Sequence, residues 1–236
     1  MVNIIFLAAG IGSRAYPLTE KLPKCLLKIG KETIIDHSFN VIGSTFSKYI
    51  VAGFEYQKIM KKMENKCNII INPFFKKTNS IASLWFAKNI LCDDVIIINA
   101  DIYFTTDIFS EILNFKEHSF VVCDSSRNFN DSDYKITVKK NRILNMGKTI
   151  DANLYCAEYA GITKLCKKDA LLLSDKIDCM VKNGEYDTWY ETALVRLINE
   201  KKLNLSFLDI SNYKWTEIDT IQDLKLARKI HFSKKG

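Results

Sequence analysis

Histidine, proline and long apolar stretches are scarce in this sequence. Three histidines and three prolines occur among 236 residues. No apolar stretch approaches the roughly 20 residues of a membrane-spanning helix, which argues against a membrane protein. The seven cysteines are scattered without a Cys-x-x-Cys pair, which argues against a zinc site or a disulfide framework. We therefore expect reduced thiols and a cytoplasmic protein, and the first apolar run lacks the basic leader of a signal peptide.

The positive charge is spread along the chain. The net charge of +7 comes from lysines that occur in separated pairs, a pattern typical of a solvated surface. A nucleic-acid-binding protein would gather its basic residues on one face among aromatic residues. Only the tail at 228–231 comes near this, and the preference of helix C-termini for cations explains it. We expect neither nucleic acid nor a membrane as a partner.

Apolar runs alternate with amphipathic stretches in the first half of the chain. The runs predict strands at 2–7, 48–52, 67–71, 94–99 and 119–123. The amphipathic stretches predict helices at 33–43, 56–65, 80–91 and 106–114. In the second half the pattern predicts a hairpin at 134–146, strands at 157–163 and 205–209, and helices at 167–182, 189–200 and 220–231. Alternating strands and helices predict an α/β fold, Rossmann-like, with a mixed, mostly parallel sheet and helices on both faces.

The sequence contains no internal repeat, linker or low-complexity segment. The simplest organisation is one domain over 1–236, in which 125–200 contributes a lid over the substrate.

The opening of the chain has the character of a phosphate-binding loop. An apolar strand ends abruptly in Ala8-Ala9-Gly10-Ile11-Gly12-Ser13-Arg14, and a Pro23-Lys24 pair follows. Small residues let main-chain N–H groups converge on anionic oxygens, while Arg14 and Lys24 supply fixed positive charge. The loop lacks the Gly-Lys-Ser/Thr of a P-loop and the third small residue of a dinucleotide fingerprint. An ordinary turn with an exposed arginine remains the alternative.

Two further segments place acids where a metal ion could be held. The apolar strand 95–99 leads through Ala100 into Asp101, and a hard cation can bind at the carboxyl end of such a strand. Near the C-terminus, the alternation of Glu217-Ile218-Asp219 places both acids on one face. The alternatives are a turn at Asp101 and an N-cap at Asp219.

These segments together resemble nucleotidyltransferases of the sugar-phosphate pyrophosphorylase type. The matching residues are Leu-Ala-Ala-Gly-x-Gly-x-Arg at 7–14, Pro17-Leu18-Thr19, Pro23-Lys24, and the acids Asp101 and Asp219. The resemblance implies a GT-A-like nucleotidyltransferase fold in which Asp101 and Asp219 bind Mg²⁺, with Glu217 a third ligand or a group behind the ligands. It implies catalytic roles for Arg14 and Lys24. The nucleotide-binding residues it suggests are Leu7, Ala8, Ala9, Gly10, Gly12, Ser13, Asn79, Ser83 and Ala100. Asn79 also fits an ordinary helix N-cap.

The segment 185–191 is the basis for predicting the acceptor, the molecule to which the nucleotidyl group is transferred. It concentrates acids and aromatic residues, and a cationic group is recognised by such a set through carboxylate and cation–π contacts. From spacing alone, a helix start with buried aromatics is slightly favoured. The segment is similar to one in bacterial CTP:phosphocholine cytidylyltransferases, which implies a phosphorylated, amine-bearing acceptor, CTP as donor and a role in decorating surface polysaccharides. The acceptor-binding residues predicted in this way are Glu158, Tyr159, Asp187, Trp189, Tyr190 and Glu191.

Two other functions stay open from the sequence. A sugar-1-phosphate uridylyl- or thymidylyltransferase is the enzymatic alternative, although the Glu-Lys-Pro such enzymes often carry is missing. A non-catalytic nucleotide-binding module is the other, and the presence of Arg14, Lys24, Asp101 and Asp219 together argues against it. We expect a monomer or a homodimer.

Overall fold

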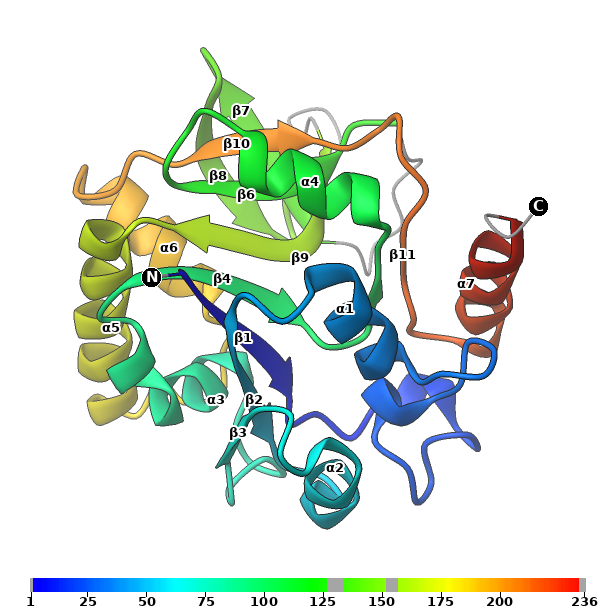
Figure 1. The fold of residues 1–236 in the computed structure, drawn as a ribbon. Coiled ribbons are helices and arrows are strands. Elements are labelled where there is room, and N and C mark those ends of the chain that lie inside the picture. The colour runs from blue at the N-terminus through cyan, green and yellow to red at the C-terminus, as the bar shows by residue number, and fades with distance from the viewer. Residues whose placement is uncertain (1, 127–133, 152–156, 234–236) are drawn as a thin grey trace.

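A mixed, mostly parallel sheet runs through the centre of the molecule, with helices against both of its faces (Figure 1). The computed structural model of the protein describes residues 2–126, 134–151 and 157–233. The strands are β1 (Val2–Ala8), β2 (Ser47–Ala52), β3 (Asn68–Ile71), β4 (Asp94–Asn99), β5 (Ile102–Tyr103), β6 (Phe120–Asp124), β7 (Lys135–Lys139), β8 (Arg142–Gly147), β9 (Ala157–Leu165), β10 (Ser206–Asp209) and β11 (Thr216–Glu217). The helices are α1 (Ile34–Ile42), α2 (Tyr56–Met63), α3 (Ser80–Phe86), α4 (Thr106–Asn114), α5 (Lys167–Lys182), α6 (Glu191–Asn199) and α7 (Ile221–Ser233). None of the described helices is long and apolar enough to cross a membrane.

The strand order places β1 in the middle of the sheet. The order is β10-β6-β9-β4-β1-β2-β3, and β1 pairs in parallel with both β2 and β4. β9 runs antiparallel between β6 and β4, and the hairpin β7–β8 extends from β9. Parallel strands covered on both faces need continuous apolar runs, which β1 and β4 supply. The predicted fold class is confirmed, and the carboxyl ends of β1, β2 and β4 meet at one edge.

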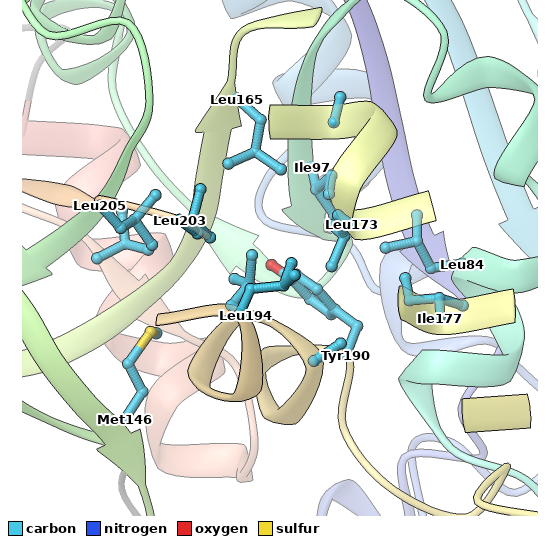
Figure 2. Packing of buried hydrophobic residues seen from close by; sticks show 14 of the residues in the cluster. Leu84, Ile97, Met146, Leu165, Leu173, Ile177, Tyr190, Leu194, Leu203 and Leu205 are labelled. Carbon is cyan, nitrogen blue, oxygen red and sulfur yellow. The ribbon is translucent and has the colours of Figure 1, made fainter. Parts of the chain in front are cut away.

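Alternate residues of the central strands enter two different cores. Ile5 and Ile97 belong to the core beneath α3, α5 and α6. Ile4 and Ile96 belong to the core beneath α1, α2 and α4. This follows from the two-residue period of a strand, which sends successive side chains to opposite faces. Figure 2 shows the first core, where Ile97, Leu84 and Leu173 come from different elements and meet over the sheet.

The predicted elements occur, and the differences lie at their ends and in short pieces. The stretch 80–91, predicted as one helix, is α3 followed by a 3-10 turn at Lys88–Ile90. The i→i+3 bond from Ala87 N to Leu84 O tightens the chain there and directs Leu91 into the core. The antiparallel ribbon of β5 and β11 was not predicted, because two-residue strands are too short to show a period.

Four residues assigned to the acceptor from the sequence lie below the surface. The exposed fractions are 5% for Glu158, 5% for Tyr159, 0% for Tyr190 and 3% for Glu191. The Tyr190 hydroxyl is 2.6 Å from that of Tyr159 and 3.0 Å from Thr163 Oγ1, and its ring packs among leucines (Figure 2). These four side chains are thus buried, and their contact with the acceptor stays a prediction. Tyr159 in β9 and Tyr190 just before α6 pack in the core beneath α3, α5 and α6.

Glu191 is a carboxyl group buried without full compensation. Its Oε2 has no hydrogen-bond partner among the described residues. Burial raises its pKa from the ordinary 4.5 to about 8, against the opposing effects of a backbone N–H and Lys148. The folded protein therefore holds a neutral Glu191 at pH 7.

The buried Glu191 makes the stability of the fold depend on pH. Because its pKa is higher in the folded than in the unfolded chain, its contribution is complete below pH 4.5 and is lost as the pH rises through 8. We expect Glu191→Gln to unfold at nearly the same temperature as the wild type at pH 5. At pH 9 the variant should be more stable by roughly 2–5 kcal/mol.

Thermal and urea unfolding from pH 5 to 9 measures this difference. Glu64→Gln is the control, because Glu64 is exposed at the end of α2. Parallel curves for the wild type and Glu191→Gln across this range would contradict a neutral buried Glu191.

Candidate active site

The loop after β1 is fixed to the ends of two neighbouring strands. Ala9 O accepts a hydrogen bond from Phe54 N at 3.0 Å, and Leu7 O accepts one from Ala100 N at 3.1 Å. Gly53 lets the chain after β2 approach this loop, since a Cβ there would lie 2.7 Å from Ala9 O. The sheet edge thus holds the main chain of residues 8–10 in one place.

Gly12 turns the loop back toward Lys24. Its φ of 70° lies in the left-handed region that favours glycine. Thr19 Oγ1 donates to Gly12 O at 2.7 Å and fixes the turn. A Cβ on Gly12 would lie 3.3 Å from Lys24 Cε, so the missing side chain gives Lys24 its route across the loop.

The Lys24 ammonium lies between two carboxylates that are distant in the sequence. Its Nζ is 2.7 Å from Asp101 Oδ2 and 2.7 Å from Asp219 Oδ1. Burial by itself lowers the pKa of Lys24, but attraction to the two carboxylates outweighs burial and raises the pKa above its usual value. Lys24 is therefore a permanent cation, only 13% exposed, at the carboxyl edge of the sheet.

Three acids form a cluster around this ammonium. Carboxylate oxygens of Asp101, Glu217 and Asp219 lie within 4.8 Å of one another. The ribbon β5–β11 brings them together, because it pairs Glu217 with Ile102 and lets Ile218 N donate to Asp101 O at 3.0 Å. Burial, and then the charges of Asp101 and Asp219, raise the pKa of Glu217. Such a set of oxygen donors suits a hard cation.

Asp219 is not the N-cap of α7. Asp223 Oδ2 accepts from Thr220 N at 2.7 Å, and Asp223 N donates to Thr220 Oγ1 at 3.3 Å. These two residues cap the helix reciprocally. The Asp219 carboxylate pairs instead with Lys24 and with Arg14, whose Nη2 lies 2.7 Å from Asp219 Oδ2. With 52% of its side chain exposed, Arg14 stands at the mouth of the site.

The opposite wall is held together by Asn72. This side chain, 1% exposed, donates to Thr78 Oγ1 and to Ser83 Oγ, each at 3.1 Å. Asn79 caps α3 through a bond from Ser80 N at 2.8 Å, so the N-cap interpretation of Asn79 is confirmed. The capping residue also lines the pocket, so the structural role and the predicted binding role are compatible.

A pocket opens between the loop after β1 and the start of α3. It is lined by Leu7, Ala8, Ala9, Gly10, Gly12, Lys24, Cys25, Asn72, Phe75, Thr78, Asn79, Ser80, Ser83, Asn99, Asp101 and Trp189. Most of the predicted nucleotide-binding residues are in this lining, whereas Ser13 and Ala100 are not. Of the predicted acceptor residues, Trp189 lines the pocket and is 41% exposed. Asp187 is exposed in the same segment.

Asn72, Phe75 and Asn99 also line the pocket, although the sequence did not single them out. Asn72 and Asn99 each stand at the end of a parallel strand, Asn72 directly after β3 and Asn99 as the last residue of β4. A polar residue at the carboxyl end of a parallel strand is the sequence feature that could have identified Asn72 and Asn99. Phe75 had no signal, because its position depends on the fold of the loop after β3.

Comparisons with known proteins agree with this geometry. Residues 3–136 match the family model described as nucleotidyl transferase. A CTP:phosphoglutamine cytidylyltransferase from Campylobacter jejuni is 30% identical over 95% of this chain and 98% of its own length. A choline-phosphate cytidylyltransferase from Streptococcus pneumoniae is 24% identical over 97% of this chain and 98% of its own.

A solved structure has the same fold. That of a CTP:phosphocholine cytidylyltransferase from Streptococcus pneumoniae aligns with a TM-score of 0.79 at 20% identity, over 98% of this chain and 99% of its own. By the family match over residues 3–136 and the identity to the C. jejuni relative, the chain belongs to the nucleotidyl transferase family.

Proposed function

We propose that this protein is a Mg²⁺-dependent cytidylyltransferase that transfers CMP from CTP to a small, phosphorylated, amine-bearing acceptor and releases pyrophosphate. The observation that carries the proposal is the direct contact of Lys24 and Arg14 with the acids Asp101 and Asp219 beside the loop after β1. Phosphates need cations and a metal ion needs carboxylates, and both sets lie within a few ångström of each other here. The names of the C. jejuni and S. pneumoniae relatives support CTP as the donor.

The nucleotide would occupy the pocket between the loop and α3. Main-chain groups of residues 8–10 lie at its floor, and Asn79 and Ser83 form the opposite wall. Small residues and a fixed backbone suit close approach of a base and a phosphate chain. Arg14 and Lys24 would then hold the β- and γ-phosphates.

The acidic cluster fits a magnesium ion. Mg²⁺ prefers carboxylate oxygens and is commonly bound by one or two carboxylates together with substrate phosphates. Asp101 and Asp219 would hold the ion, with Glu217 as a third ligand or behind them. When bound, the ion would neutralise charge that develops on the phosphates.

The transfer itself requires positioning more than acid–base chemistry. An ionised oxygen of the acceptor phosphate forms a bond to the α-phosphorus of CTP, and the bond from that phosphorus to the bridging oxygen breaks as pyrophosphate leaves. The attacking oxygen is already ionised, so no general base is needed. In keeping with this, no histidine lines the described pocket. Lys24 and Arg14 orient the phosphates and stabilise their charge.

The acceptor would approach from the side of Trp189. The Trp189 ring already holds a cation, because Lys148 Nζ lies 5.2 Å from its centroid. Asp187 adds a nearby exposed acid. An ammonium group on the acceptor would suit the same ring and acid. A role in surface polysaccharide decoration stays a prediction.

A substrate panel tests the proposal. We expect pyrophosphate release with CTP and Mg²⁺ when phosphocholine, phosphoethanolamine, phosphoglutamine or 2-aminoethylphosphonate is supplied. ATP, GTP and UTP should give much slower release with the same acceptors. Turnover only with UTP or dTTP and glucose-1-phosphate would overturn the substrate assignment, and silence with every pair would favour a nucleotide-binding module.

Asp101→Asn should abolish turnover, lowering kcat by at least about 1,000-fold, because a metal ligand is lost while the shape is kept. The melting temperature of the variant should stay within a few degrees of the wild type. Asp175→Asn, at an exposed position of α5, is the matched control. Wild-type rates for Asp101→Asn at millimolar Mg²⁺ would refute the metal assignment.

Lys24→Gln separates metal binding from turnover. The ammonium occupies the carboxylates that Mg²⁺ would use, so its removal should strengthen Mg²⁺ binding in the absence of nucleotide. We expect a larger rise of the melting temperature with Mg²⁺ than in the wild type. We also expect a fall in kcat/KM of about 100-fold or more, since a phosphate contact is lost.

Lys21→Gln, an exposed lysine close in sequence, should change neither quantity. A Mg²⁺-induced shift that is smaller in Lys24→Gln than in the wild type would contradict competition between the ammonium and the metal ion.

A further inference from the structure

A second cluster of metal-ligating side chains lies between α1 and α7, apart from the pocket. Glu32, His37 and His231 each offer a donor atom, and these atoms lie within 4.8 Å of one another. None of the three lines the described pocket. Two of the three histidines in the chain thus face the same glutamate. We propose that Glu32, His37 and His231 form a binding site for a transition-metal ion of the Zn²⁺ class.

The distances suit such an ion. His37 Nδ1 lies 3.1 Å from Glu32 Oε1, and His231 Nε2 lies 3.8 Å from the same oxygen. Tetrahedral zinc with ligands at about 2.0–2.1 Å separates neighbouring donor atoms by roughly 3.3–3.5 Å. The two separations from Glu32 fall on either side of that value, and the donor atoms of all three residues lie within 4.8 Å of one another.

The hydrogen bonds of His37 leave one of its nitrogens facing a second acceptor. His37 Nε2 lies 2.9 Å from Phe104 O, and a carbonyl oxygen only accepts, so Nε2 carries a hydrogen. In the neutral ring, Nδ1 then presents a lone pair to the Glu32 carboxylate, which is also an acceptor. Two facing acceptors need a proton or a metal ion between them.

Neighbouring groups fix the orientation of these side chains, as is common for the ligands of a metal ion. A backbone carbonyl fixes one nitrogen of His37, and Asn40 Nδ2 donates to the other Glu32 oxygen at 2.6 Å. The Tyr103 ring stacks on His37 with centroids 4.5 Å apart and holds the plane of the imidazole. Two imidazoles and one carboxylate favour Zn²⁺ over Mg²⁺, because imidazole is a softer ligand than water or carboxylate.

The metal ion would tie the C-terminal helix to the rest of the fold. His231 is in the last turn of α7, whereas His37 is in α1 (Figure 1). Gly30 makes room for this contact, since a Cβ there would lie 3.2 Å from His231 Cδ2. We therefore expect Zn²⁺ to raise the melting temperature of the protein.

Nitrogen-15 NMR of histidine side chains tests the site directly. In protein labelled at histidine and treated with chelator, the ring nitrogens of His37 and His231 give the metal-free reference signals. One equivalent of Zn²⁺ should shift His37 Nδ1 and His231 Nε2 together and leave exposed His118 unchanged. Signals of His37 and His231 that stay unchanged on addition of Zn²⁺, or a shift confined to His118, would overturn the proposal.

Affinity measurements with variants give an independent answer. Glu32→Gln and His231→Gln should each weaken Zn²⁺ binding at least tenfold, whereas His118→Gln should not. The zinc-dependent rise in melting temperature should disappear in the first two variants. Mg²⁺-dependent turnover of Glu32→Gln should match the wild type, so the result does not depend on the proposed reaction. Equal Zn²⁺ affinity in Glu32→Gln and the wild type would overturn the site.

Discussion

The ion contacts of Lys24 are the interaction on which the site depends. Its ammonium joins Asp101 and Asp219, which lie 77 and 195 residues away in the sequence. Without that charge, three carboxylates would repel one another in a partly buried place. In the proposed reaction, a metal ion would replace the ammonium between the acids and Lys24 would contact the phosphates.

The sheet and its small ribbon together decide where these groups meet. Parallel pairing of β1 with β4 sets Leu7 opposite Asn99, so the loop after β1 and Asp101 emerge at one edge. The ribbon of β5 and β11 then returns the C-terminal segment to that edge. The site is thus built from three strand ends, and each contributes only one or two side chains.

The segment 186–190 is attached to the start of α3. Asn79 N donates to Tyr186 O at 3.0 Å, and Tyr190 N donates to Ser80 Oγ at 3.0 Å. The buried Tyr190 anchors this segment in the core, which leaves Trp189 at the pocket. On the side of the acidic cluster, α7 follows Asp219 and packs against α1 near His231. The elements that flank the site therefore owe their positions to core contacts outside it.

The sequence by itself determined the longer strands and helices, the fold class and the glycine-rich turn after β1. Apolar periodicity and the positions of glycines are local features of the sequence, so they can be recognised without knowledge of the fold. Tertiary structure alone decided that Tyr190 and Glu191 are buried while Trp189 stays exposed, because neighbouring positions at a helix start differ only in direction. It also decided that Glu32, His37 and His231 converge, since they come from separate elements. Such contacts arise from packing between segments that are distant in the sequence, so the pattern of neighbouring residues does not predict them.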